Sequence, residues 1–351
     1  MPDWLTASIA PLDQTVLAQA IEKQQQLTKP QGALGVLETI ATTISALQGS
    51  TEPRVEQAQI VIFAADHGIA QENVSAFPQA VTAEMVKNFS AGGAAISVLA
   101  KQFDLPLQVI NLGLVTELPS LPLVQSKVIA KGTQNFLSQA AMTEGQLLQA
   151  FEIAKNCVDE IKKNNKQLFI AGEMGIANTS SATALVCALE NIKVKELAGY
   201  GTGLDSVGLE HKIDIIEQSI HKHQPEMNSA LNILQILGGF EIAALTASYI
   251  RCAQQGIIAL VDGFICSVAA LFAIRLNPQC RPWLIFSHQS AEQGHKKVLA
   301  LIDAKPLLKF DLRLGEGSGA ALAYPLIRSA CLLQNEMASF ASASVSEKSS
   351  A

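Results

Sequence analysis

The amino-acid sequence predicts an α/β protein whose large domain is Rossmann-like, with helices on both faces of a parallel sheet. Short apolar runs alternate with longer helical patterns, an order typical of parallel strands joined by crossover helices. Apolar residues make up 49% of the 351-residue chain and charged residues 16%, which fits a sheet buried on both faces or a subunit that hides surface in an oligomer. Strands are expected at residues 59–68, 107–113, 166–175, 256–263 and 282–290.

Helical patterns fill the segments between these strands and both ends of the chain. The first 45 residues lack strand signals and the last helical pattern has no strand after it, so residues 1–45 and 319–337 are expected to pair as a small helical domain. Residues 46–318 then form the large α/β catalytic domain, and the low-complexity residues 338–351 a disordered tail. Helices are expected at residues 79–101, 142–164, 208–223, 229–254, 291–303 and 319–336.

Composition excludes several classes of protein. A formal charge of −6 without a basic run argues against nucleic acid as the main partner and favours a small ligand. The most apolar segment, residues 257–275, is interrupted by Asp262, so no membrane insertion is expected. The N-terminal residues do not resemble a secretory signal, which favours a cytoplasmic location. Six scattered cysteines without a CxxC pair are expected to be buried, reduced thiols.

Polar residues follow the predicted strands at the points where the strands end. In a parallel sheet these ends meet at one edge, and ligands bind beyond that edge. We therefore expect one rim to collect the side chains of Asp66, His67, Glu173, Asp262 and His288.

Two glycine clusters suggest a phosphate site. GEMGIANTS (residues 172–180) lies between a strand and a helix, where backbone N–H groups attract an anion and glycines permit close approach. GYGTGLDSVG (residues 199–208) precedes another helix, which contains Lys212. Neither cluster matches the GxxxxGK[ST] loop of nucleoside triphosphate sites, so a monophosphate is the better candidate.

Histidines and acidic residues also raise the question of a metal. The Asp66–His67 pair is too small for a complete ligand set, and the spacing of Glu292 and His295 is compatible with a second ligand pair on a helix. A role in orienting other residues or capping a helix is the favoured interpretation. A metal-dependent hydrolase using Asp66, His67, His288 and His295 is the alternative.

The segment LRLGEGSGAA (residues 312–321) isolates Glu316 between Gly315 and Gly317, ahead of an Ala-rich helical pattern. A solvated turn residue at the start of a helix is one interpretation, because a carboxylate interacts favourably with the helix dipole there. The other is functional: flanking glycines allow a carboxylate to come close to a ligand.

Taken together, the motifs resemble those of the nicotinate-nucleotide:dimethylbenzimidazole phosphoribosyltransferase family (CobT). The resemblance covers about residues 5–335 and rests on several motifs in order. These are KPQGALGVLE, AADHGI followed by VSAFPQAVTAEMVKNFSAGGAA, GEMGIANTS, GTGLD, GGFEIAAL, VDGF, SHQSAEQGH and LRLGEGSGAALAYPLIRSA.

This resemblance implies a reaction and a catalytic base. Members of the family transfer the phosphoribosyl group of nicotinate mononucleotide to 5,6-dimethylbenzimidazole, giving α-ribazole 5′-phosphate and nicotinate for the lower ligand of cobalamin. No metal or cofactor is required, because nicotinate already leaves from a pyridinium nitrogen. The resemblance places the base that deprotonates the benzimidazole at Glu316. Glu173 is a second catalytic candidate. It could stabilise positive charge on the ribose, or it could bind the ribose hydroxyls.

The resemblance also implies binding residues and a homodimer. For phosphate and ribose it indicates Gly175, Ile176, Asn178, Thr179, Gly203 and Lys212, although an exposed helix lysine is the plain alternative for Lys212. For the acceptor base it indicates Phe77, Glu84, Met85 and Leu314.

Two positions depart from the family pattern. Glu84 stands where members generally have a glutamine-like residue, and Tyr200 stands where many have the arginine of GRGTG. The acceptor is therefore less determined than the reaction, and adenine or a phenol stays open. A non-catalytic binder of nicotinate mononucleotide is the alternative from another class, but phosphate binding alone would not need Glu316.

Overall fold

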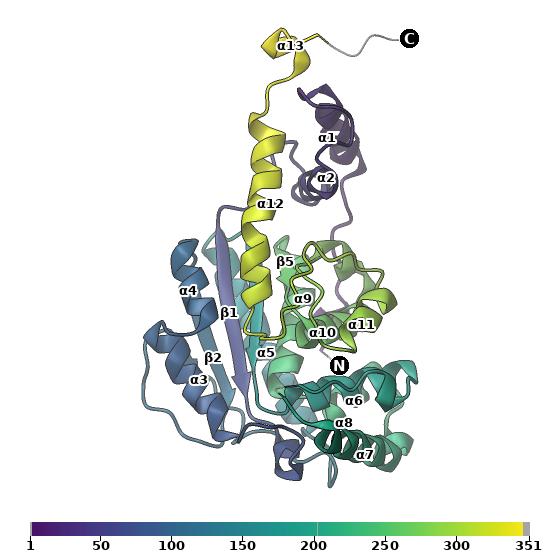
Figure 1. Ribbon diagram of the computed structural model, residues 1–351. Helices are drawn as coiled ribbons and strands as arrows, with labels where there is room; N and C mark the ends of the chain where they lie inside the picture. The colour runs from purple at the N-terminus through teal and green to yellow at the C-terminus, as the bar shows by residue number, and fades with distance from the viewer. Residues whose placement is uncertain (1, 202, 347–351) are drawn as a thin grey trace.

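The computed structural model describes residues 2–201 and 203–346, and its centre is a six-stranded parallel sheet (Figure 1). The strand order, β3-β2-β1-β4-β5-β6, is that of a doubly wound sheet. It confirms the predicted Rossmann-like fold and the five predicted strands; β3 escapes prediction because it is short and mostly exposed. The strands are β1 Ala58–Ala65, β2 Leu107–Gly113, β3 Val124–Ser126, β4 Leu168–Met174, β5 Ile258–Val261 and β6 Leu284–Phe286.

Helices occupy most of the remaining described chain. The α-helices are α1 Gln14–Gln26, α2 Val36–Gln48, α3 Ala80–Ala91, α4 Ala95–Gln102, α5 Glu144–Lys163, α6 Asn178–Glu190, α7 Ser206–His223, α8 Ala230–Leu237, α9 Phe240–Gln255, α10 Phe264–Leu276, α11 His295–Leu301, α12 Ser318–Glu336 and α13 Phe340–Ala343. The 3-10 helices are η1 Asp3–Thr6, η2 Gly68–Glu72, η3 Val194–Glu196, η4 Gln224–Glu226 and η5 Pro278–Trp283.

Glycines divide two of the long predicted helices. The expected helix at 79–101 is two helices, because Gly92 ends α3 in the left-handed conformation, with φ of 82°. The expected helix at 229–254 breaks between α8 and α9, where a Cβ at residue 238 would overlap the Leu234 carbonyl oxygen. The helix expected at 291–303 begins only at His295.

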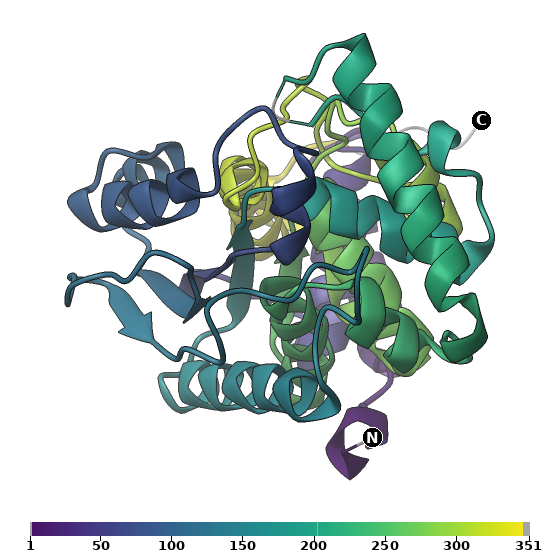
Figure 2. The same ribbon diagram turned by 90° about the horizontal axis from the view of Figure 1, so that it is seen from below.

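Helices cover both faces of the sheet. On one face α9 packs against α5 and against β1, β4 and β5, and it is buried on nearly all sides. On the other face α3 lies against β1 and β2, while α12 packs on β4, β5 and α4. Viewed from below, toward the ends of β1 and β2, α5 lies on the opposite side of the sheet from α3 and α4 (Figure 2).

Helix α2 packs on α12 away from the sheet, and α1 packs on α2 and meets the C-terminal part of α12 (Figure 1). A buried amide contact joins them: Gln24 Nε2 donates to Gln334 Oε1, and Gln334 Nε2 donates to the Ala20 carbonyl oxygen at 3.3 Å. These contacts support the division into a small helical and a large α/β domain, which stays a proposal.

Both chain ends differ in part from the sequence prediction. Residues near the N-terminus pack on the large domain, since Asn277 Nδ2 donates to the Leu5 carbonyl oxygen at 3.0 Å and Gln279 accepts from the Ile9 N–H at 2.8 Å. The expected disordered tail is wrong for its described part, because α13 forms behind a capping box at Ser339. Residues 347–351 of that tail lie outside the described residues.

Two expectations from composition can be compared with the structure. Within residues 2–201 and 203–346, no helix is both long and apolar enough to cross a membrane. All six cysteines are free and buried, as predicted. Burial raises the pKa of the Cys157 thiol to about 12, so the reactive thiolate is disfavoured there.

Candidate active site

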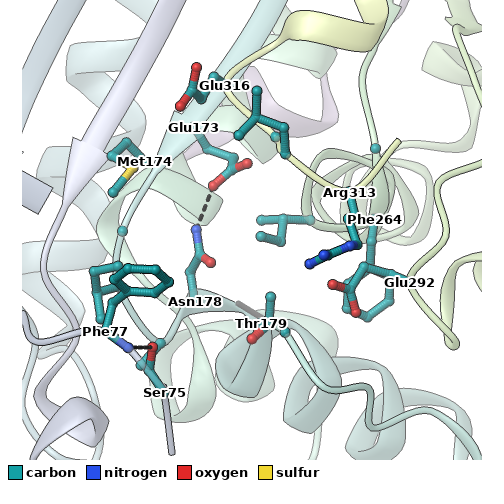
Figure 3. Close-up of a pocket in the computed structure, with 18 of the residues that line it drawn as sticks. Ser75, Phe77, Glu173, Met174, Asn178, Thr179, Phe264, Glu292, Arg313 and Glu316 are labelled. Carbon is teal, nitrogen blue, oxygen red and sulfur yellow. Dashed lines mark hydrogen bonds between the residues drawn. The ribbon is translucent and has the colours of Figure 1, made fainter. Parts of the chain in front are cut away.

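A pocket of about 320 Å³ opens at the carboxyl ends of the strands (Figure 3). Its wall includes the loops that follow β1, β4, β5 and β6, the turn before α12, one face of α3 and Gly201. This is where the predicted rim lies, and Glu173 and His288 line the pocket. The other three rim residues, Asp66, His67 and Asp262, are buried beside it.

The turn that carries Glu316 has an uncommon backbone. Gly315, Glu316 and Gly317 have φ values of 82°, 65° and 82°, and such a conformation is costly for a residue with a side chain. The turn lies against β4, where a Cβ on Gly172 would be 2.5 Å from the Glu316 carbonyl oxygen. A Cβ on Gly315 would be 2.5 Å from Glu173 Oε1. These glycines therefore allow two carboxyl groups to share one end of the pocket.

Glu316 has the environment of a base that works near neutral pH. The residue is only 5% exposed, and its Oε2 has no hydrogen-bond partner within the described chain. Burial, reinforced by the negative charge of Asp262, raises the pKa of Glu316 to about 7, although the backbone N–H of Ile96 opposes the shift. A carboxyl group with such a pKa is a suitable general base.

Glu173 is as little exposed as Glu316, at 5%, and is held by one amide. Its Oε2 accepts a hydrogen bond from Asn178 Nδ2, drawn as a dashed line in Figure 3. Burial raises the pKa of Glu173 to about 8, and the nearby charges of Glu241 and Asp262 add to the shift. The neutral carboxyl is favoured in the unliganded protein. Of the two predicted roles, hydrogen bonding to ribose hydroxyls fits this state better than charge stabilisation by an anion.

The phosphate motif GEMGIANTS forms the start of α6 and part of the pocket wall. Ala177 adopts the left-handed conformation, with φ of 74°, and turns the chain into the helix. Gly175 lies so close to β1 that a Cβ there would be 2.5 Å from the Ala65 carbonyl oxygen. The helix start faces the cavity, and the positive end of a helix dipole attracts anions. Pocket-lining residues in this motif include Gly175, Ile176, Asn178 and Thr179.

Lys212 lies behind this wall rather than on it. Its side chain is buried, and Nζ donates to Thr179 Oγ1 at 3.0 Å and to the Gly199 carbonyl oxygen at 3.3 Å. Burial lowers the pKa of Lys212 to about 8, against the opposing charge of Glu292. The alternative of an exposed helix lysine is therefore wrong. In the second glycine cluster Gly201 lines the pocket, whereas the predicted Gly203 is exposed and does not.

The predicted acceptor residues are mostly brought together. Phe77, Met85 and Leu314 line the pocket, and Phe77 and Leu314 are 50% and 58% exposed. Glu84 is the exception: it is exposed and absent from the wall. The reason is helical geometry, because Val81 and Met85 are four residues apart and share the pocket face of α3.

The sequence did not assign every residue of the wall: Arg313 was not singled out, and Glu292 was considered only as a metal ligand. Arg313 and Glu292 lie side by side near Phe264 (Figure 3). Arg313 is three residues before Glu316 in a motif already singled out, so its position was a usable signal. Tyr200, the other departure from the family pattern, is 52% exposed and not part of the wall.

The histidines considered as metal ligands have protein partners instead. His67 Nε2 lies 2.6 Å from Glu241 Oε1, a partner that nothing in the sequence indicated. His295 contacts Ser267 and Ser290 at 2.9 and 2.8 Å, and burial beside His288 lowers the pKa of His295 to about 3. In the described part of the chain, no group of three or more His, Cys, Asp or Glu residues is arranged to hold a metal ion.

Comparison with known proteins identifies the family. A phosphoribosyltransferase family model matches residues 9–345. Nicotinate-nucleotide–dimethylbenzimidazole phosphoribosyltransferase of Pseudomonas putida (strain W619) is 51% identical over 347 residues, or 99% of each chain. The enzyme of that name from Azotobacter vinelandii is 52% identical over 346 residues, or 98% of each chain. The chain belongs to this phosphoribosyltransferase family.

Solved structures agree with this membership in the nicotinate-nucleotide–dimethylbenzimidazole phosphoribosyltransferase family. The crystal structure of CobT from Thermus thermophilus has a TM-score of 0.91 and 38% identity, and the match covers 95% of this chain and 100% of that chain. The resemblance predicted from the ordered motifs is thereby confirmed. The chain is an enzyme of the pentosyltransferase class.

The close approach of the Glu316 turn to β4 can be tested with Gly172→Ala. The added methyl would lie 2.5 Å from a backbone oxygen, so we expect a loss of about 1–3 kcal/mol in unfolding free energy and a displaced turn. Urea unfolding and a crystal structure of the variant measure these effects. Gly145→Ala is the matched control, because a Cβ there meets only Thr143 Oγ1 at 3.9 Å. Equal stability of the two variants would contradict the proposed packing constraint.

The raised pKa of Glu173 predicts a pH-dependent contribution to stability. The unfolded carboxyl has an ordinary pKa of 4.5 and the folded one a pKa of about 8, so between these values only the folded state holds the proton. Glu173 therefore stabilises the fold below pH 4.5 and loses this contribution as the pH rises to about 8. Glu173→Gln cannot ionise, and its melting temperature relative to wild type should rise from pH 5 to pH 8. Glu152→Gln on the surface of α5 controls for loss of one charge. If the difference in melting temperature between Glu173→Gln and wild type stayed constant from pH 5 to pH 8, the folded carboxyl of Glu173 would not be protonated in this range.

Proposed function

We propose that this chain transfers the phosphoribosyl group of nicotinate mononucleotide to 5,6-dimethylbenzimidazole. The products are α-ribazole 5′-phosphate, for the lower-ligand nucleotide of cobalamin, and nicotinate. The observation that carries the proposal is Glu316, a buried carboxylate whose pKa is raised to about 7 at the end of a largely apolar pocket. The names of the relatives, which are similar over nearly the whole chain, point to the same reaction.

The chemistry divides between the donor and the acceptor. As the bond from C1′ to the pyridinium nitrogen breaks, its electron pair returns to that nitrogen and nicotinate leaves without needing an acid. One nitrogen of the benzimidazole attacks C1′ from the opposite face, which inverts the configuration from β to α. Positive charge then builds on the acceptor ring, and Glu316 removes the proton of its second nitrogen. A metal or cofactor has no step to perform in this scheme.

Binding of the donor is assigned to the α6 end of the pocket. We place the phosphate at the start of α6, near Thr179, whose hydroxyl accepts a hydrogen bond from the buried Lys212 ammonium at 3.0 Å. Lys212 adds positive charge from behind the wall and orients this hydroxyl. Glu173, which precedes this helix at the end of β4, is assigned to the ribose hydroxyls. The donor would thus lie between the phosphate end and the Glu316 end.

Binding of the acceptor is assigned to the apolar side. Phe77, Met85 and Leu314 suit a flat aromatic ring. The exposed Glu84 offers no carboxylate to a polar acceptor there, which favours a benzimidazole over adenine or a phenol. The backbone conformation of Glu316 argues against a non-catalytic binder, because a costly φ of 65° would serve no purpose in phosphate binding alone.

We also propose that the enzyme is a cytoplasmic homodimer. Two apolar side chains of the pocket, Phe77 and Leu314, are half exposed in the single chain. A neighbouring subunit over this side would remove them from water and close the reaction space.

The assigned base is tested by Glu316→Gln with nicotinate mononucleotide and a panel of benzimidazoles, purines and phenols. Glutamine keeps the size of the side chain but cannot take the proton, so turnover with dimethylbenzimidazole should fall by about two to four orders of magnitude. Nicotinate release and product mass measure this. Glu152→Gln on α5 is the control and should turn over normally. Near-normal turnover by Glu316→Gln would reject the role, and a better acceptor in the panel would revise the substrate.

The pH profile gives an independent check on the same group. Only the ionised carboxylate accepts a proton, and the pKa of Glu316 is raised to about 7. We therefore expect kcat/KM of the wild type to fall about tenfold per pH unit below pH 7 and to level off above it. An acid limb centred near pH 4.5, the ordinary value, would mean that Glu316 is not the group that limits the rate.

A further inference from the structure

Helix α12 begins without a capping side chain of its own. Its N-cap residue is Gly317, which has no side chain to accept the first N–H groups of the helix. Asp262, which directly follows β5, supplies the missing acceptor from another part of the fold. Its Oδ2 accepts from the Gly317 N–H at 3.2 Å, and its Oδ1 accepts from the Ala320 N–H at 2.9 Å.

We propose that Asp262 is the positioning residue of Glu316: its two hydrogen bonds fix the turn that carries the base, and its negative charge makes that base stronger. The inference rests on the proposed role of Glu316 and extends it to a residue that does not touch the substrate. Asp262 is 1% exposed and does not line the pocket. Its effect must therefore pass through the turn and through the electric field.

The hydrogen bonds matter because the turn does not favour its own conformation. Three successive residues with positive φ persist only where the surroundings hold them. Asp262 binds the residue directly after Glu316 and the first turn of α12 at once, and it is itself fixed at the end of a buried strand. The carboxylate of Glu316 is thereby placed relative to the sheet and to Glu173. Misplacement by about 1 Å at such a group costs on the order of 100-fold in rate.

Charged and titratable groups surround the Glu316 turn on several elements. Around the Glu316 turn are Glu173 from β4, Asp262 from β5, His288 after β6 and Arg313 in the same loop, while α4 contributes the N–H of Ile96. After burial, Asp262 is the largest influence that raises the pKa of Glu316. Burial also raises the pKa of Asp262, but His288, with Nδ1 at 3.7 Å, and backbone N–H groups oppose that shift and favour the anion.

A purely structural cap and a positioning residue that also tunes the base differ in their pH profiles. In Asp262→Asn the side-chain oxygen can still accept one N–H, but the negative charge is gone. We expect the acid limb of kcat/KM to move about one pH unit lower, because the like charge no longer opposes ionisation of Glu316. The plateau rate should fall about 10- to 100-fold, because one of the two hydrogen bonds is lost. A cap without electrostatic influence would lower the rate and leave the limb in place.

The experiment combines this profile with a readout that needs no turnover. Titration of ¹³C-labelled glutamate carboxyl groups by NMR, with Glu316 assigned from Glu316→Gln, follows the base directly in wild type and in Asp262→Asn. Asp159→Asn is the matched control. Asp159 lies on α5, away from the pocket, where it pairs with Arg251 at 2.6 Å, so its loss should change neither the pH profile nor the NMR titration of Glu316.

Each outcome decides between the possibilities. A lower midpoint for the NMR titration of Glu316 in Asp262→Asn supports the proposal. It does so even if the wild type does not use nicotinate mononucleotide, a result that would contradict only the proposed function. An unchanged midpoint and acid limb in folded Asp262→Asn overturn the electrostatic role. If this variant does not fold, Asp262→Ser, whose hydroxyl can accept one N–H, takes its place. Failure of both variants to fold would reduce Asp262 to a structural cap and overturn the proposal.

Discussion

The turn that carries Glu316 lies against the backbone of β4, at a separation that residue 172 permits only because it is glycine. This contact places Glu316 at the same end of the pocket as Glu173, whose Oε1 occupies the space that a Cβ on residue 315 would need. Because β4 is buried in the sheet and the turn packs directly against it, the sheet fixes the position of the turn. The position of the proposed base therefore depends on glycine at residues 172 and 315 as much as on the two carboxylates.

Several buried carboxyl groups meet at this end of the sheet. Burial raises the pKa values of Glu173, Asp262 and Glu316; the charges of Glu241, Asp262 and Glu316 raise that of Glu173 further, and the charge of Asp262 raises that of Glu316. The fold accommodates them by giving most of them a hydrogen-bond partner: Asn178 for Glu173, His67 for Glu241 and the start of α12 for Asp262. Glu316 Oε2 has no such partner in the described chain. A carboxyl group with a raised pKa and one oxygen without a partner is suited to accept a proton from a ligand, in line with the proposed reaction.

Helix α12 connects this site to the rest of the molecule. Its first turn is held by Asp262 at the sheet, while away from the sheet it packs on α2 and its C-terminal part meets α1 (Figure 1). A single helix of 19 residues thus joins the packed ends of the chain to the pocket. The Glu316 turn immediately precedes this helix, so the two parts of the fold meet where the proposed chemistry takes place.

The parallel sheet, most helices and the loops that form the pocket could be predicted from the order of amino acids alone, because apolar periodicity and glycine clusters are local properties of the chain. Glu316 and Glu173 could be singled out in the same way, since both stand in distinctive motifs. Packing was needed to establish that Glu84 faces away, that Gly201 rather than Gly203 lines the wall, and that Lys212 lies behind Thr179. Likewise, the pairing of His67 with Glu241 and of Asp262 with α12 joins residues 174 and 58 positions apart. Such contacts, and the desolvation that raises the pKa values of the buried acids, exist only once distant segments pack together and exclude water.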